Sequence, residues 1–258
     1  MLVDSHCHLD IMDKQYSPEA VAAYVEQAKV NDVAYMQCVS INMQDFPKIL
    51  DIANRFNNVF ASVGVHPNDK NEPEVTQEEL VKCAADENVI AIGETGLDYF
   101  RSSGDLDWQR DRFRTHIAAA KEAKKPLIIH IRDAFADAIK IMEEENAGEV
   151  GGVVHCFTGN LDEAKHAIDL NFHIGISGIV TFNSAAEIKE VAANIPEHRL
   201  LVETDSPFLA PVPHRGKPNV PAYVRYVAQY IAQLRDEPLE KVAAYTTENF
   251  FKLFPAKR

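Results

Sequence analysis

Two histidines near the start of the chain, His6 and His8, have a spacing that suits metal binding. Side chains alternate between the two faces of a β-strand, so residues two apart point the same way. On a strand, both imidazoles can therefore bind a single metal ion, while Cys7 points toward the wall formed by the strand. A solvated pair of histidines at a polar strand end is the alternative interpretation, and position in the fold decides between the two.

More histidines and carboxylates end or follow short apolar runs further along the chain. They are His66, Glu94, His130, His155 and Asp205, with Glu203 two residues before Asp205. Imidazole nitrogens and carboxylate oxygens together suit zinc and similar divalent ions, whereas sites built from oxygen alone suit magnesium or calcium. The pattern predicts a metal centre if the fold brings these positions together.

The elements that must position these residues alternate between short apolar runs and amphipathic helical stretches. The apolar runs are rich in Val, Ile and Leu, as expected of parallel strands covered on both faces. They span residues 2–4, 33–39, 59–65, 89–92, 127–130, 153–155, 173–176 and 200–203. Strict alternation of strand and helix leaves two main architectures, an open doubly wound sheet and a closed barrel.

The number of predicted strands favours the barrel. Eight strands in 258 residues fit a single (β/α)8 barrel of the TIM type. A glycine-rich phosphate fingerprint is missing after the first strand, which argues against a nucleotide-binding open sheet. No long linker or charge block marks a boundary, so we expect one domain over residues 1–258. The C-terminal ends of barrel strands converge on one mouth, where the histidines and carboxylates are expected to meet.

Several helix starts are recognisable. Ser17 before Pro18 predicts an N-cap followed by a proline at the first helical position. Thr76 with Glu79, and Ser184 with Glu187, have the spacing of a capping box. Long helical patterns also cover roughly 108–123, 134–146, 220–234 and 239–253.

Charge narrows the kind of partner that the protein can bind. The chain has 26 Lys and Arg against 39 Asp and Glu, a formal net charge of −13. Proteins that grip the nucleic acid backbone usually carry a basic face. A polyanion must therefore be attracted by a local site, such as bound cations and a few basic residues. This argues against tight duplex binding but not against a nuclease.

Composition also bears on location. No run of about 18 apolar residues occurs, and no basic region precedes an apolar stretch at the N-terminus, so we expect neither a membrane span nor secretion. The four cysteines are scattered without a CxxC pair and are expected to be free thiols in a reducing compartment. The predicted location is cytoplasmic.

The chain resembles the TatD-type metal-dependent hydrolases and deoxyribonucleases, within the amidohydrolase-like barrels. The resemblance runs the length of the chain. It rests on DSHCHLD (4–10), GVHP (64–67), IGETGLDY (92–99), PLIIHIRDA (126–134), HCFTG (155–159), ETDSPFLAP (203–211) and HRGKPNVP (214–221). The sequence of the last segment is most similar to the YcfH-like branch of the family.

The resemblance implies a binuclear centre with two divalent ions per subunit, for which zinc, manganese and magnesium are the candidates. By this resemblance His6, His8 and Asp205 hold one ion, His130 and His155 hold the second, and Glu94 bridges the pair. Many relatives in the wider superfamily bridge their metals with a carboxylated lysine. Glu94 provides a bridging carboxylate without modification.

The expected reaction is attack of a metal-activated water on a phosphodiester, because a divalent ion can lower the pKa of a bound water to roughly 7. Asp205 is expected to accept the proton of that water, and Glu203 to orient water or a metal ligand. His66 is expected to donate to a phosphate oxygen.

Substrate contacts are predicted from residues beside these positions. Arg132, Arg215 and Lys217 are candidate phosphate ligands, with solvated loop charges as the alternative. Tyr99 and Phe100 are candidates for stacking on a base, with packing at the barrel mouth as the alternative for Tyr99. Four further histidines are expected to be structural or solvent-facing rather than metal ligands: His116, His166, His173 and His198. Cys156 is likewise expected to pack rather than to bind metal.

The leading prediction is a 3′ exonuclease acting on single-stranded or damaged DNA, with RNA as a further substrate. One alternative keeps the binuclear centre but hydrolyses a small amide, ester or phosphoester, because fold and ligands support both reactions. Another is a non-enzymatic metal-binding barrel, which the complete set of ligand positions disfavours. We expect no membrane association and no obligate protein partner.

Overall fold

Parallel strands form the centre of the molecule. The computed structural model describes residues 1–13, 16–70 and 73–258, and within them a single sheet of eight strands runs in sequence order. The strands are β1 (Leu2–Cys7), β2 (Val33–Cys38), β3 (Val59–Val63), β4 (Val89–Asp98), β5 (Leu127–Arg132), β6 (Gly152–Val154), β7 (Phe172–Ile176) and β8 (Leu200–Val202). Each strand pairs in parallel with the next. The predicted TIM barrel is confirmed.

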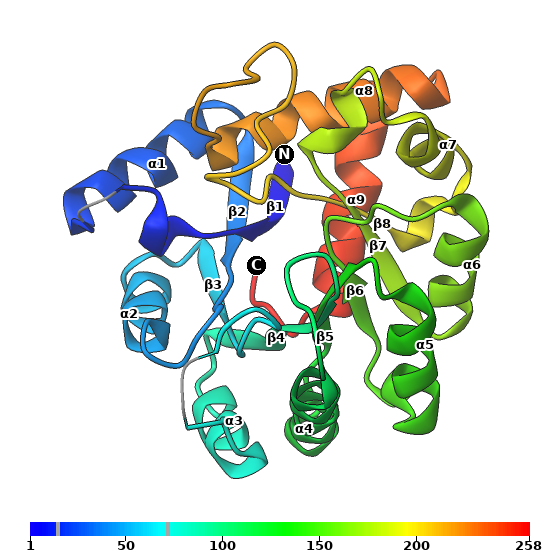
Figure 1. The fold of residues 1–258 in the computed structure, drawn as a ribbon. Coiled ribbons are helices and arrows are strands. Elements are labelled where there is room, and N and C mark those ends of the chain that lie inside the picture. Colours follow the sequence, from blue (N-terminus) through cyan, green and yellow to red (C-terminus); the bar gives the residue numbers. More distant parts are fainter. Residues whose placement is uncertain (14–15, 71–72) are drawn as a thin grey trace.

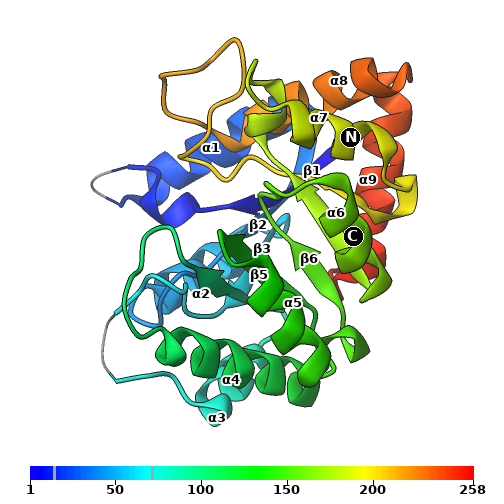
Figure 2. The same cartoon turned by 45° about the vertical axis from the view of Figure 1, so that its right-hand side comes forward.

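Helices surround the strands on the outside of the barrel (Figure 1). They are α1 (Pro18–Val30), α2 (Phe46–Arg55), α3 (Gln77–Ala84), α4 (Asp107–Ala123), α5 (Phe135–Glu144), α6 (Leu161–Asp169), α7 (Ala186–Asn194), α8 (Val224–Arg235) and α9 (Leu239–Leu253). Figure 2 shows α3 and α4 on the side opposite α7 and α8. Within the described ranges, none of the helices combines the length and apolar content that a membrane span requires.

Most predicted helix starts agree with the structure. Ser17 caps α1 by accepting a hydrogen bond from the Ala20 N–H, and Thr76 forms the capping box with Glu79. The predicted box at Ser184 is wrong, because Ala185 takes the N-cap position of α7. The Ala185 N–H is held by the Phe182 carbonyl in the preceding turn, so the helix begins too late for Ser184 to cap it.

Other differences concern helix and strand lengths. The helix predicted from residue 220 begins at Val224 as α8, after a short 3-10 turn, η5 (Pro221–Tyr223). A capping box at Asn160, reciprocal with Glu163, starts α6 and was not predicted. β1 and β4 are longer than predicted, so His6 and Glu94 lie inside strands rather than after them.

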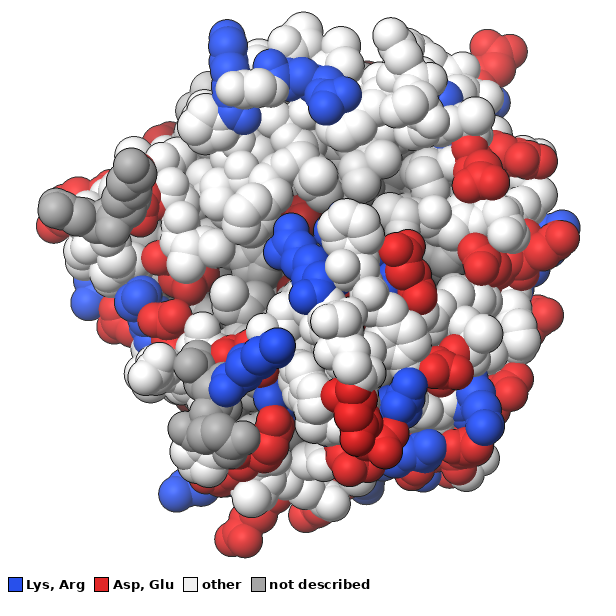
Figure 3. Space-filling view, viewed as in Figure 1, with Lys and Arg blue, Asp and Glu red and all other residues white. Residues whose placement is uncertain are grey.

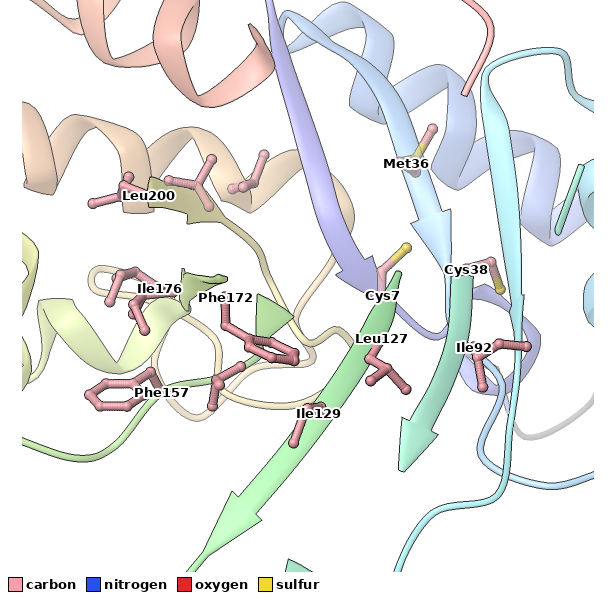
Figure 4. Packing of buried hydrophobic residues seen from close by; sticks show 14 of the residues in the cluster. Cys7, Met36, Cys38, Ile92, Leu127, Ile129, Phe157, Phe172, Ile176 and Leu200 are labelled. Carbon is pink, nitrogen blue, oxygen red and sulfur yellow. The ribbon is translucent and has the colours of Figure 1, made fainter. Parts of the chain in front are cut away.

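Apolar side chains fill two separate regions of the fold. One lies between the strands and the surrounding helices, where Figure 4 shows Cys38 on β2, Leu127 on β5 and Phe172 on β7. The other lies inside the barrel. Its residues are Val3, Val39, Phe60, Ile90, Ala91, Ile128, Val153 and Leu201, together with Phe250 and Phe254 near the end of the chain.

Helix α9 closes the N-terminal end of the barrel. Thr247 donates a hydrogen bond to the Met1 carbonyl, and Asn249 donates one to the Leu200 carbonyl, at the starts of β1 and β8. Phe250 of this helix is fully buried and packs with the inward-facing apolar residues. The opposite end of the barrel is left to the loops that follow the strands.

The barrel closes between β1 and β8 through side chains as well as backbone. The Asp4 carboxylate accepts hydrogen bonds from the Thr204 N–H at 2.8 Å and the Thr204 hydroxyl at 2.6 Å. The Asp205 N–H donates to the His6 carbonyl at 2.9 Å. This closure sets the first histidine of the chain beside the carboxylate that follows the last strand.

Candidate metal centre

Glu94 lies at the centre of a buried group of imidazoles at the C-terminal ends of the strands. One of its oxygens, Oε2, lies 3.3 Å from His6 Nε2 and 3.9 Å from His8 Nε2. Asp205 Oδ1 lies 3.7 Å and 3.4 Å from the same two nitrogens. The predicted first ligand set therefore meets on one side of Glu94, close enough for a single cation to contact every member.

The other oxygen of Glu94 faces a second group of histidines. Oε1 lies 2.8 Å from His155 Nε2, 3.1 Å from His130 Nδ1 and 3.3 Å from His66 Nε2. A carboxylate whose two oxygens point to two separate sets of nitrogens has the geometry of a bridging ligand.

The facing nitrogens fit cations between them. His6 Nε2 and His8 Nε2 lie 3.3 Å apart, and His130 Nδ1 and His155 Nε2 lie 3.4 Å apart. At most one proton can occupy each of these gaps, so at least one lone pair in every pair points at its neighbour. Lone pairs that converge in this way suit a shared divalent ion.

Hydrogen bonds on the far side of two rings orient those lone pairs. His8 Nδ1 lies 3.0 Å from the Val39 carbonyl, so it carries the proton and leaves Nε2 as the donor atom for a metal. His130 Nε2 lies 3.1 Å from Asp98 Oδ2, which leaves Nδ1 free in the same way. In both cases the free nitrogen is the one that faces Glu94.

Glu203 is buried beside this group of histidines and contacts His155. Its Oε1 accepts a hydrogen bond from the Cys156 N–H at 2.6 Å and lies 3.4 Å from His155 Nδ1. Among the described residues, His6 Nδ1 and Glu203 Oε2 have no hydrogen-bond partner although both are buried. The side chains of His6, His155 and Glu203 form a further set that could contact a cation.

The histidines keep the carboxylates ionised. Burial alone raises the pKa of Glu94, but attraction to His155 and His66 outweighs it and holds the pKa well below its usual range. At Asp205 burial acts in the same direction and is outweighed by contact with His8, so its pKa is also lowered. Both groups are therefore anions at neutral pH, as metal ligands must be.

Backbone conformation holds Asp205 in place. Its φ of 56° lies in the left-handed region, which short polar side chains tolerate better than most. Hydrogen bonds from its N–H to the His6 carbonyl and from the Phe208 N–H to its own carbonyl, each 2.9 Å long, fix this conformation. Such conformations concentrate at functional sites.

Glycines on either side of Glu94 let β4 run close to β5. Gly93 and Gly96 have φ values of 145° and 133°, which L-residues rarely adopt. A Cβ atom at Gly93 would overlap the Ile128 carbonyl, and one at Gly96 would overlap the His130 carbonyl. The GETG segment therefore brings Glu94 within reach of the imidazole on the neighbouring strand.

Asp98 is a site residue that was not predicted from the sequence. It is almost fully buried, and its Oδ2 contacts His130 Nε2 and accepts a hydrogen bond from Asn68 Nδ2 at 2.7 Å. Burial raises its pKa, but the contact with His130 and other hydrogen bonds lower it below its usual range. The available signal was the strand period of two, because residues 94 and 98 share one face of β4.

The predicted substrate contacts lie in different environments. The Tyr99 hydroxyl donates to Asp137 at 2.7 Å and accepts from Arg110 Nε at 3.0 Å, which favours packing over base stacking. The Arg132 guanidinium lies 3.9 Å from the centre of the Phe100 ring.

The predicted loop cations follow β8. The Arg215 guanidinium lies 3.8 Å from the centre of the Phe182 ring. Lys217 is exposed, and its N–H donates to the His214 carbonyl. Figure 3 shows many Asp and Glu side chains around the rim, with few Lys and Arg toward the centre of this face. Positive charge near the mouth is therefore sparse and local.

His116 and His166 have the structural and surface positions that were expected of them. His116 is buried between α4 and the loop after β3, where its Nε2 accepts from the Val65 N–H at 3.0 Å. His166 is paired with Glu143 on the surface. Cys156 Sγ lies 3.3 Å from the Ser177 hydroxyl, which agrees with packing.

Comparison with known proteins adds a family-level finding. The family model described as TatD related DNase matches residues 3–255. The chain is 45% identical over 253 residues to the metal-dependent hydrolase YcfH of Escherichia coli K12, covering 98% of this chain and 95% of that protein. It is 33% identical over 219 residues to the 3′-5′ ssDNA/RNA exonuclease TatD of Escherichia fergusonii, covering 83% and 84% of the two chains.

A solved structure agrees with these matches. The crystal structure of YjjV, a TatD homologue from Escherichia coli K12, superposes with a TM-score of 0.91 at 27% identity. The superposition covers 99% of this chain and 98% of that one.

Proposed function

The chain belongs to the TatD-related DNase family, and from that premise we propose that it removes nucleotides from the 3′ end of single-stranded or damaged DNA, with RNA as a further substrate. Its coarser class, a metal-dependent hydrolase close to the YcfH-like proteins, agrees with the prediction from sequence. The observation that carries the proposal is Glu94, whose two oxygens face two sets of imidazole nitrogens. The relative named as a single-strand exonuclease supports the choice of substrate.

The proposed centre holds two divalent ions, of zinc, manganese or magnesium. We assign His6, His8 and Asp205, which lie close enough to share one ion, to the first. We assign His130 and His155, which both lie next to Glu94 Oε1, to the second, with Glu94 between the two. When bound, such ions supply a nucleophilic water at neutral pH and neutralise charge on the phosphate.

Asp205 is proposed to accept the proton of the attacking water. Its side chain is 15% exposed, whereas the side chains of Glu94 and Glu203 are 3% and 0% exposed. Among these carboxylates it is therefore the one that water entering from the mouth can reach. Glu203 is buried against the Cys156 N–H and His155, so its proposed role is to position His155 rather than to contact the substrate.

His66 is proposed to donate a hydrogen bond to a phosphate oxygen. The Asn68 N–H donates to its Nδ1 at 3.0 Å, which leaves the proton of the neutral ring on Nε2. Nε2 lies 3.3 Å from Glu94 Oε1 at the edge of the centre. A ring held with its N–H toward the site favours a donor over a metal ligand.

Arg132 and Arg215 are proposed to contact the phosphates of the strand. Each guanidinium lies on an aromatic ring, Phe100 or Phe182, and among the described residues neither makes a hydrogen bond or ion pair. Planar guanidinium groups can make bidentate contacts with phosphate. Lys217 stays a candidate for the same role: it is exposed, and the hydrogen bond that it donates to the His214 carbonyl comes from its backbone N–H.

The test is nucleotide release from a 3′-labelled single-stranded oligonucleotide, with manganese, magnesium or zinc added and with EDTA as control. The same strand labelled at its 5′ end and a blunt duplex report direction and strand preference. Metal-dependent release from the 3′ end that is lost in Asp205→Asn supports the proposal. No release with any metal, when the metal content of the sample is confirmed, contradicts it.

The negative charge of the protein supports a second candidate function. A net charge of −13, with many Asp and Glu side chains toward the edge of the face in Figure 3, would repel a long polyanion. The second candidate is hydrolysis of a small phosphoester, amide or ester by the same centre. Turnover of a small ester by a sample that releases no nucleotide would favour it.

A further inference from the structure

Large apolar side chains that are mostly exposed include two aromatic residues near the metal centre. Among the described residues, Phe100 is 61% exposed and Phe208 is 52% exposed. Phe208 follows Asp205 by three residues, and Phe100 lies just beyond the end of β4, which carries Glu94. Both rings therefore lie on loops at the mouth of the barrel.

The faces of these rings are not equally available. The Arg132 guanidinium covers Phe100 at 3.9 Å from the ring centre. The described part of the chain sets no cation and no stacked ring on Phe208. Its only ring contact there is with His8, whose ring lies 6.3 Å away at 66° in an edge arrangement. Phe208 thus offers a flat apolar face beside a residue of the metal centre.

Hydrogen bonds fix the backbone of Phe208. Its N–H donates to the Asp205 carbonyl at 2.9 Å, and its own carbonyl accepts from Asn219 Nδ2 at 2.6 Å. Asn219 is fully buried and also donates to the Thr204 carbonyl at 2.9 Å. The loop is therefore tied to the end of β8 from both sides, and the ring is presented by an ordered backbone.

We propose that Phe208 is the platform on which the base at the 3′ end of the substrate stacks, an inference that rests on the proposed nuclease function. The contact with His8 sets the ring next to the atoms where the terminal phosphodiester would be cut. A phenyl ring has no polar atom with which to read base edges, so it accepts any of the bases. The assignment moves base stacking from Tyr99, whose hydroxyl is held by Asp137, to the loop after β8.

The first test compares two single-stranded oligonucleotides that differ only in whether the 3′-terminal nucleotide carries a base or is abasic. The wild-type protein is expected to prefer the base-bearing end, measured as the ratio of the two kcat/KM values. Phe208→Ala is expected to lower that ratio about tenfold, the size of a base–aromatic stacking contact. Phe208→Trp keeps a stacking surface and is expected to retain the ratio.

Val212→Ala is the matched control for loss of an exposed apolar side chain. Val212 lies on the same loop and is 48% exposed. It is expected to leave the ratio at the wild-type value. Thermal unfolding of each variant separates a loss of stacking from a loss of fold.

A second readout does not depend on turnover. An oligonucleotide with 2-aminopurine at its 3′ end loses fluorescence when that base stacks on an aromatic ring. Asp205→Asn protein is expected to quench it on binding, and the double variant with Phe208→Ala to quench it much less.

The outcomes separate the stacking inference from the proposed function. Release of nucleotides by the wild-type protein with an equal preference ratio in Phe208→Ala overturns the stacking role alone. A wild-type protein that shows no preference for the base-bearing end also overturns it. A metal-loaded protein that hydrolyses a small ester but releases no nucleotide overturns the proposed function and this inference with it.

Discussion

The inside of the barrel consists of two layers that lie two residues apart along the same strands. The pairs are Ile128 and His130 on β5, Val153 and His155 at the end of β6, and Leu201 and Glu203 at the end of β8. In each pair the first side chain belongs to the apolar group that includes Phe250 and Phe254, and the second belongs to the candidate metal centre. One period of the strand therefore separates packing from chemistry.

The comparison teaches how a cluster of buried charges can be kept in one arrangement. Buried carboxylates and imidazoles cost stability unless they are paired or bind metal. The apolar layer below them, with Phe250 and Phe254 inserted from the N-terminal end, fixes the strands that carry them. Stability and activity are expected to depend on different layers.

Replacing Asp205 by Asn should separate the two layers most strongly. Loss of the proton acceptor and of an anionic ligand is expected to reduce kcat roughly 10³- to 10⁴-fold. The metal-free variant is expected to stay folded, as thermal unfolding can check, because the apolar layer that fixes the strands is unchanged. Near-normal nucleotide release from this variant would show that the proton acceptor has been assigned to the wrong residue.

Phe250→Ala is the reverse experiment. Removing a fully buried ring from the apolar layer is expected to lower the free energy of unfolding by about 3 to 5 kcal/mol. The kcat/KM of the folded fraction is expected to stay within a few-fold of wild type. Urea unfolding and activity measured on the same sample test this, and a large loss of kcat/KM without loss of stability would contradict the separation.

Asp98→Asn tests how the polar layer is oriented. The carboxylate holds His130 with its free nitrogen toward Glu94, so its loss is expected to weaken metal binding 10- to 100-fold. Isothermal titration of metal-free protein measures the change. Asp107→Asn, on the exposed start of α4, is the matched control and is expected to bind metal as the wild type does.

The pKa values of two buried histidines, one in the metal centre and one outside it, differ in the same way as the two layers. At His8 burial lowers the pKa but contact with Asp205 outweighs it and raises the pKa to about 9. At His116 no carboxylate offsets burial, and the pKa falls from 6.5 to about 4. Between pH 6.5 and about pH 4, the unfolded chain therefore binds a proton at position 116 while the folded chain does not.

The part of the free energy of unfolding that comes from position 116 is therefore expected to fall as pH drops through this window. The contribution of His116 is about 2 kcal/mol between pH 7 and pH 5. His116→Gln should remove that part of the pH dependence, even if it is less stable at pH 7. Urea unfolding of both proteins at the two pH values measures it, and equal pH dependence would refute the assignment.

The barrel could be predicted from the sequence because its signals are local. Val, Ile and Leu runs mark each strand, and the polar residues at their ends follow from the position of barrel mouths. The structure brings the predicted His6, His8, Glu94, His130, His155 and Asp205 together. Their roles as ligands, the single domain and the cytoplasmic location stay predictions.

Features that depend on tertiary partners could not be predicted in the same way. The extension of β4 to Asp98 depends on close contact of Gly93 and Gly96 with β5. The contact of Tyr99 with Asp137 depends on how α5 packs, and the false cap at Ser184 on the turn before α7. Spacing along the chain indicates that residues 94 and 98 would share a face if the strand continued, but not that it continues.

The central claim is that Glu94 lies between two cation sites, and metal titration of the chelator-treated protein tests it most directly. We expect the wild type to bind two manganese or zinc ions per chain, and Glu94→Gln to lose high-affinity binding of at least one. Circular dichroism of both proteins checks that the barrel is intact. If the folded Glu94→Gln variant binds two ions as tightly as the wild type, Glu94 is not a bridging ligand and the account of the centre is wrong.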